Sequence, residues 1–207
     1  MKNKIMIGIV AAIAVLVIII GFICFLVHNN KNFIPGIAGL EKKNMAIIYC
    51  TQNDAIPQVI NAVTKKAKFD VFQVKPAAPY PTDANAFQQR IKQENADLSK
   101  VVYETPRIKL RKYHFIAFAT PLIDGNVCPV LKKYIKDHKY DFKNKSVSKI
   151  ILTKPNENPQ YANMFFYYEL DKSFSKPGMV IDDTSAKNIE FVTNIWLGQM
   201  EFRRSEL

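Results

Sequence analysis

Cysteine and histidine are the residue types in this chain best suited to bind a metal ion or to act as nucleophile and base. The chain has three of each, and they form no cluster with the spacing of zinc ligands. They are spread over the whole sequence as Cys24, Cys50, Cys128, His28, His114 and His138. We therefore expect no metal site.

Carboxylates are the other candidates for chemistry. The aspartates at 182–183, and Asp137 beside His138, fit helix caps or exposed helix ends better than catalytic pairs, because no nucleophile accompanies them. Asp54 and Asp124 each follow an apolar run, and together they could bind a metal or a basic partner. Two residues from separate loops are too few to predict a site, so we predict no catalytic residue and favour a non-enzyme.

The elements that must position these side chains alternate between strand and helix. β-rich runs predict strands, and apolar residues spaced by three or four predict the helices between them. The expected strands are 45–50, 69–74, 114–119, 146–153 and 178–181, and the expected helices are 56–63, 83–95 with Asp83 as N-cap, 130–137, 161–174 and 183–202. This order predicts a three-layer α/β fold with a five-stranded, mostly parallel sheet.

In such a fold the ligand crevice lies outside the carboxyl ends of the strands. The loops at 50–56, 120–129 and 153–161 are therefore expected to form it.

The chain begins with a long apolar segment. From Ile5 to Val27 there are 23 residues without a charge, an amide side chain or a proline. A helix of this length reaches about 35 Å, enough for a bilayer core of about 30 Å. A signal peptide has a shorter apolar stretch followed by a small-residue cleavage site, and a buried core helix has a polar stripe. We therefore predict one transmembrane helix at 5–27, behind a short tail at 1–4.

The remaining chain is expected to be a stalk at 28–43, rich in turn-forming residues, and one domain at 44–207. Lysines flank both ends of the transmembrane segment, so the positive-inside rule gives nearly a tie. The very short tail weakly favours an exported domain, as on a bacterial inner-membrane protein.

The chain is strongly basic, with 29 Lys and Arg against 18 Asp and Glu and a net charge of +11. No basic motif interleaved with aromatic residues marks a nucleic-acid surface. Anionic lipid headgroups or an acidic partner suit a tethered domain better, and a solvated lysine-rich surface is the plainest explanation. The aromatic run at 161–168 has too many rings for one buried helix face, which favours an exposed patch for a partner or the membrane.

Three segments resemble the flavodoxin-like family over about residues 44–182. FDVFQVKPAAPYPTD at 69–83 is similar to the second strand and the "P-x-x-P-Y-P-x-D" turn of one subgroup. YHFIAFATPLIDGNVCP at 113–129 is similar to its third strand and "P-I-W-W-G-x-x-P" loop, and YDFKNKSV at 140–147 is similar to its "Y-D-F-x-G-K-x-V" segment. The resemblance implies the same fold, with non-covalently bound FMN and electron transfer.

The family's FMN loops fall on Thr51, Asn53, Ile123, Gly125 and Asn156 of this chain. Its phosphate loop, S/T-x-T-G-x-T, offers hydroxyls and backbone N–H groups to the phosphate. Here Asp54 places a negative charge beside that dianion, and Ile56 replaces the last hydroxyl. Asp124 would repel a reduced flavin, and the third loop has two prolines that lack N–H donors. We therefore expect that the fold is kept and that FMN binding is lost.

The resemblance also concerns Cys50 and Cys128. In the strand order 2-1-3-4-5 of this fold, the first and third strands are neighbours. Cys50 ends the first strand and Cys128 follows the loop after the third, so the two could lie close together. In an exported domain they could form a disulfide. Two separate buried thiols are the simpler explanation, and both alternatives stay open.

These inferences lead to a membrane-anchored flavodoxin-like module that acts by binding a protein partner in or at the membrane, for example as an accessory subunit of an envelope complex, with no cofactor. The alternative is an FMN-dependent electron-transfer protein tethered beside a membrane redox partner. A third class, a hydrolase, lacks a nucleophile–base pair. Absorbance in the flavin bands distinguishes the first two.

Overall fold

The computed structural model describes residues 33–41, 43–51, 55–104, 108–171 and 173–203. The segment predicted to cross the membrane, residues 5–27, lies outside these ranges. Among the described helices, none is long and apolar enough to span a bilayer.

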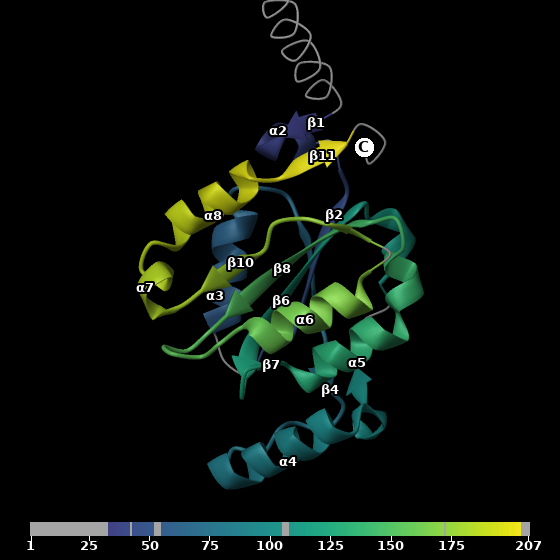
Figure 1. Cartoon of the computed structure of the whole chain (residues 1–207), viewed down its shortest axis with the longest axis vertical. Coiled ribbons are helices and arrows are strands. Elements are labelled where there is room, and N and C mark those ends of the chain that lie inside the picture. Colours follow the sequence, from purple (N-terminus) through teal and green to yellow (C-terminus); the bar gives the residue numbers. More distant parts are fainter. Residues whose placement is uncertain (1–32, 42, 52–54, 105–107, 172, 204–207) are drawn as a thin grey trace, which may run out of the picture.

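A parallel sheet forms the middle of the molecule (Figure 1). Five strands follow one another in the spatial order β3 (Asp70–Gln73), β2 (Met45–Tyr49), β6 (Phe115–Ile123), β8 (Ser146–Leu152) and β10 (Met179–Ile181). Every neighbouring pair in this order is parallel. The order is the 2-1-3-4-5 arrangement of doubly wound α/β folds, so the predicted fold class is confirmed.

The predicted count of five strands was too low, because the sheet has seven. Strand β6 continues to Ile123 and turns back at Asp124 and Gly125, both with positive φ, into β7 (Asn126–Val127), which pairs with it antiparallel. Strand β9 (Phe174–Ser175) pairs with the beginning of β8 in parallel. Residue 174 was predicted to end a helix, but α6 (Gln160–Glu169) stops five residues earlier.

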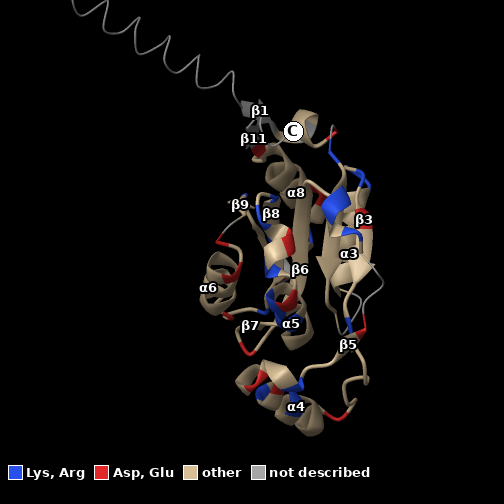
Figure 2. Cartoon of the chain, turned by 90° about the vertical axis from the view of Figure 1, so that its right-hand side faces the viewer, with Lys and Arg blue, Asp and Glu red and all other residues tan. Residues whose placement is uncertain are grey.

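Helices cover both faces of the sheet, as Figure 2 shows from the side. On one face α5 (Pro129–Asp137) and α6 pack over Ile116 and Phe118 of β6 in one apolar core. On the other face α3 (Ala55–Thr64) and α8 (Ile189–Gly198) pack over Phe115 and Ala117 in a second core. Since β6 is buried on both faces, its near-continuous apolar sequence follows directly from its central place.

Helix α4 (Ala84–Ala96) lies beyond the end of the sheet rather than on a face, next to the short β4 (Lys75–Pro76) and β7 (Figure 1). Asp83 caps it by accepting a hydrogen bond from the backbone N–H of Ala86 at 2.8 Å, which confirms the predicted N-cap. A 3₁₀ turn, η1 (Leu98–Lys100), and β5 (Tyr103–Glu104), which pairs with β4, return the chain to the sheet. Further 3₁₀ turns, η2 (Leu110–Lys112) and η3 (Lys139–Phe142), flank β6 and β8.

The two ends of the described chain meet at the opposite pole of the molecule (Figure 1). Strand β1 (Phe33–Pro35) pairs antiparallel with β11 (Glu201–Arg203), and α2 (Gly36–Leu40) ends in a buried Leu40. This part of the predicted stalk therefore packs with the domain. The predicted closing helix is divided into α7 (Asp183–Ala186), α8 and β11, because residue 202 pairs with β1 instead of continuing a helix.

Candidate functional site

The carboxyl ends of β2 and β3 border a cavity of about 590 Å³. Thr51, which follows β2, forms part of its wall, and the rest comes from the end of β3 and the segment leading into α4. Those further lining residues include Gln73, Lys75, Pro79, Tyr80, Pro81 and Phe87. Cofactor sites in proteins have volumes of about 300–1,000 Å³ and combine apolar walls with a few polar groups. This cavity has both properties.

Tyr80 is the best-fixed side chain of that wall. Its hydroxyl donates to Glu94 Oε2 at 2.7 Å, and Arg90 Nε donates to Glu94 Oε1 at 2.7 Å. The Arg90 guanidinium also lies over the Tyr80 ring, 4.4 Å from its centre, and donates to the carbonyl of Pro79 at 2.8 Å. Phe87 contacts the same ring edge-on at 5.6 Å. Burial and the hydrogen bond to Glu94 raise the pKa of Tyr80 far above its usual range, so it stays a donor at every physiological pH.

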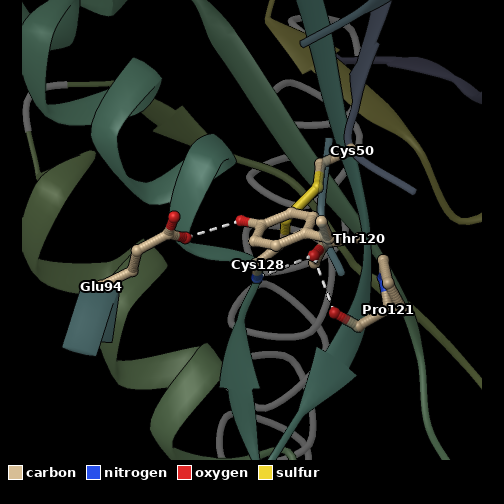
Figure 3. Close-up of a disulfide and its surroundings, with 6 residues drawn as sticks. Cys50, Glu94, Thr120, Pro121 and Cys128 are labelled. Carbon is tan, nitrogen blue, oxygen red and sulfur yellow. Dashed lines mark hydrogen bonds between the residues drawn. A yellow bond between two sulfur atoms is a disulfide. The ribbon is translucent and has the colours of Figure 1, made fainter. Parts of the chain in front are cut away.

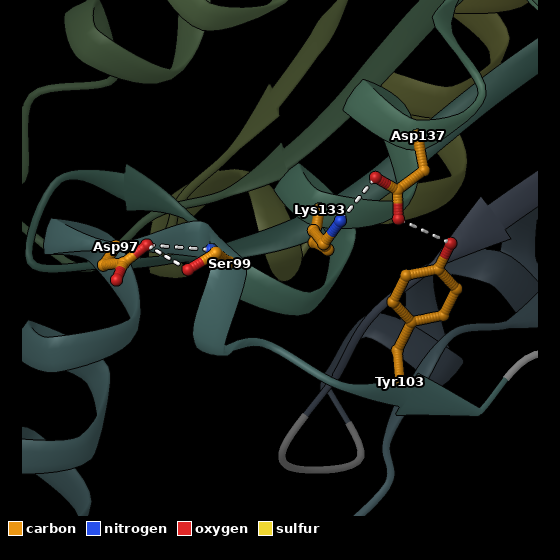
Figure 4. Close-up of polar contacts among 5 residues, drawn as sticks. All are labelled: Asp97, Ser99, Tyr103, Lys133 and Asp137. Atoms are coloured by element: carbon orange, nitrogen blue, oxygen red, sulfur yellow. Dashed lines mark hydrogen bonds and ion pairs between the residues drawn. The ribbon is translucent and has the colours of Figure 1, made fainter.

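The far end of α4 is also held by polar contacts (Figure 4). Asp97 Oδ1, at the N-cap of η1, accepts hydrogen bonds from the backbone N–H and the hydroxyl of Ser99 within that turn. The Tyr103 hydroxyl on β5 donates to Asp137 Oδ2 of α5 at 3.0 Å, and Lys133 pairs with the other oxygen at 2.5 Å. These contacts attach the returning segment to α5 and leave α4 with a fixed position below the strand ends.

Lys132 adds a third attachment between α4 and the body of the domain. Its Nζ donates to Asn95 Oδ1 on α4 at 2.9 Å and to Asn126 Oδ1 on β7 at 3.1 Å. Burial is the main cause that lowers the pKa of Lys132, to about 8, and the charge of Lys136 adds to it. The buried residues of α4 are Ile91 and Glu94, and only the first of them is apolar. The position of α4 in the cavity wall therefore depends on polar contacts.

Glu157 joins the second and third loops of the same sheet edge. Its Oε1 accepts the backbone N–H of Gly125 at 2.9 Å, and its Oε2 accepts that of Lys154 at 3.1 Å. Gly125 and Asn156 both have positive φ, which sharpens the two turns that meet here. The sequence contained no signal for this role, because a single glutamate in a loop has many possible partners.

The four described residues that were matched to FMN loops do not lie in one place. Thr51 lines the 590 Å³ cavity. Gly125 and Asn156 lie in the loops that Glu157 joins, and Ile123 is 7% exposed in the core beneath them. Asn53 lies outside the described residues. Sequence reasoning missed Tyr80 and its partners, although the motif that carried the resemblance includes that tyrosine.

A disulfide joins Cys50 and Cys128, whose Cα atoms are 6.6 Å apart (Figure 3). Both cysteines are buried. The Thr120 hydroxyl accepts the backbone N–H of Cys128 at 3.2 Å and donates to the carbonyl of Pro121 at 2.8 Å. The bond therefore connects the end of β2 with the start of α5, directly behind two of the crevice loops.

This topology, with a crevice at the carboxyl ends of a 2-1-3-4-5 sheet, defines a flavodoxin-like fold. No protein-family profile matches the chain, and no curated protein matches it in sequence. Solved structures do match. A flavoprotein from Lactobacillus acidophilus in complex with FMN has a TM-score of 0.59 at 13% identity, over 70% of this chain and 97% of that one. A putative flavoprotein from Bacteroides eggerthii has a TM-score of 0.62 at 14% identity, over 75% and 98%.

These matches correct the expectation that the crevice has no cofactor. Flavoproteins, one of them solved with FMN, share the fold, so the fold gives no support to the expectation of an empty crevice. The residues of the cavity fit that group in outline. The Thr51 hydroxyl and the Lys75 ammonium suit a phosphate, while the rings of Tyr80 and Phe87 suit a flat aromatic system. The expectation weighed the residues of the three loops and did not consider Tyr80 and Phe87 in the wall in front of α4.

Proposed function

We propose that this protein binds FMN in the cavity at the carboxyl ends of β2 and β3 and transfers electrons at a membrane. The observation that carries the proposal is the 590 Å³ cavity at the ligand-binding edge of a flavodoxin-like fold. Bound FMN would supply a redox centre able to exchange electrons with a partner.

The chain's own residues have three tasks in this proposal. Thr51 and Lys75 would hold the phosphate, by a hydrogen bond and by charge. Tyr80 and Phe87 would provide an apolar wall against the ring and keep water from that side. Glu94 positions this wall through its hydrogen bond to Tyr80.

We further propose that residues 5–27 tether the domain to a membrane, where its redox partner would be a membrane protein. A tether raises the effective concentration of such a partner without any new contact. The Cys50–Cys128 disulfide supports the exported side, since disulfides persist in oxidising compartments. Protease treatment of intact cells tests the orientation: an exported domain is digested, and a cytoplasmic one is protected.

A comparison of FMN with riboflavin tests the cavity assignment. The full chain in lipid nanodiscs is titrated into each flavin, and quenching of flavin fluorescence gives the dissociation constant. Riboflavin lacks the phosphate, so Lys75→Met should weaken FMN binding by about 10-fold or more and leave riboflavin binding within about twofold. Lys65→Met, at an exposed lysine directly after α3, is the matched control and should change neither. Equal losses for Lys75→Met and Lys65→Met would refute the assignment.

A further inference from the structure

A second hollow, of about 270 Å³, lies between α6 and the outer edge of the sheet. It shares no lining residue with the cavity described above. Figure 2 shows α6 beside β8 and β9, the elements that enclose it. Its apolar floor comes from Val147, Phe166 and Leu170, all of them in the core on this face of the sheet.

Lys149 is the unusual residue of this hollow. It lies on β8 between Val147 and Ile151, and successive alternate residues of a strand share a face. Both of those neighbours belong to the apolar core under α6, so the lysine occupies a position that otherwise calls for an apolar side chain. Its exposure is intermediate, and burial lowers the pKa of its amine below the usual range. Lys149 forms no hydrogen bond or ion pair with the residues that the structure describes.

The connection between β9 and β10 passes beside this lysine. Val147 pairs with Ser175 of β9 and Ile150 pairs with Met179 of β10, so the three residues 176–178 connect the two strands opposite Ser148 and Lys149. Gly178 lies in this connection, and a Cβ at Gly178 would be only 2.6 Å from Cγ of Lys149. The absence of a side chain there makes room for the lysine stem.

Aromatic rings border the opening. Tyr167 and Tyr168 are 75% and 65% exposed, and their ring centres lie 5.3 Å apart. Both rings and Lys149 also line an adjoining shallow hollow of about 450 Å³. Exposed tyrosines clustered around one amine are unusual for a surface that only faces water.

We propose that this hollow is a binding site for a small aromatic monocarboxylate. One ammonium without a described acceptor matches one carboxylate, and the apolar floor with the tyrosine rings matches an aromatic body. The hollow is smaller than the sites of drug-sized ligands, which limits the body to about one ring. Asp171 and Lys176 also line it, and the Lys176 ammonium donates to the carbonyl of Glu201 at 2.6 Å. The proposal does not depend on FMN binding.

The test uses the full chain in lipid nanodiscs and two fluorinated probes observed by ¹⁹F NMR. The first probe, 4-fluorobenzoate, is the anion, and 4-fluorobenzamide is its neutral isostere. We expect the wild type to bind the benzoate with a dissociation constant of about 1 mM or lower and the amide at least about 10-fold more weakly. Lys149→Met keeps the unbranched stem and removes the charge, and it should weaken benzoate binding at least about 10-fold. Lys65→Met should leave it within about twofold.

Gly178→Ala gives an independent variant, because the added methyl group displaces the Lys149 stem. It should also weaken the benzoate while leaving FMN binding unchanged. Thermal melting shows that each variant is folded, and a variant that does not melt cooperatively is replaced by Lys149→Gln. Benzoate binding that survives the loss of the Lys149 charge would overturn the proposal. Equal binding of 4-fluorobenzamide and 4-fluorobenzoate would also overturn it. So would the absence of benzoate binding at about 10 mM, which is about 10-fold above the expected dissociation constant.

Discussion

Replacing Tyr80 by phenylalanine should destabilise the domain measurably. The change removes the hydrogen bond of 2.7 Å from the hydroxyl to Glu94, whose side chain is 8% exposed. The ring keeps its edge contact with Phe87 and its place under the Arg90 guanidinium, since neither contact uses the hydroxyl. The measured effect therefore belongs to the hydrogen bond.

The magnitude follows from the charge and burial of Glu94. A hydrogen bond to a charged group contributes about 1.5–3 kcal/mol, and here the carboxylate keeps Arg90 as its remaining partner. We therefore expect a loss of about 1.5–3 kcal/mol in the free energy of unfolding. With a urea slope of about 2 kcal/mol per molar, the midpoint should fall by about 0.8–1.5 M at constant slope.

The matched control is Tyr161→Phe, which removes a hydroxyl from a side chain that is 70% exposed. Surface substitutions of this kind stay within about 0.5 kcal/mol. Urea unfolding followed by tryptophan fluorescence measures both variants. A Tyr80→Phe effect no larger than that of Tyr161→Phe would refute the idea that polar contacts fix the cavity wall.

Three further predictions concern the disulfide and the shifted titrations. Reducing Cys50–Cys128, which closes a loop of sequence separation 78, should lower the free energy of unfolding by about 4.5 kcal/mol on the chain-entropy account. After alkylation without reductant, mass measurement should find neither of these two cysteines alkylated. Alkylation of either would contradict the disulfide. Lys132 should titrate near pH 8 by NMR of ¹³C-methylated lysine, and a midpoint above 10 would contradict its burial. Tyr103 and Tyr113 have folded pKa values raised to about 12 by burial and by hydrogen bonds to carboxylates. The folded state thus keeps these protons above pH 10, so their stabilisation is complete below pH 10 and is lost between about 10 and 12, which a series of urea midpoints would measure.

The strands β2 and β6 could be predicted because their apolar runs are typical of buried parallel strands. The strand order came from the resemblance to the flavodoxin-like family. The helix ends could not. Residues 174 and 202 continue apolar patterns, but each pairs with a strand far away in the sequence, β8 and β1. Local periodicity carries no information on such pairings. Long-range contacts therefore decided both ends.

The candidate site was predicted in part for a similar reason. Thr51 and Gly125 were found because the resemblance matched them to FMN loops, and both lie in loops that follow the carboxyl ends of strands. Tyr80, Glu94 and Glu157 were missed, because their roles depend on partners 14 to 32 residues away. Lys149 had a readable signal, a charged residue between apolar neighbours that alternate along one strand.

The central claim is that the cavity between the strand ends and α4 binds FMN. The most direct measurement is the visible spectrum of the full chain in nanodiscs after incubation with excess FMN and removal of the free flavin. The account predicts retained absorbance in the flavin bands, equivalent to one FMN per chain. A colourless protein, with all FMN removed, would contradict it.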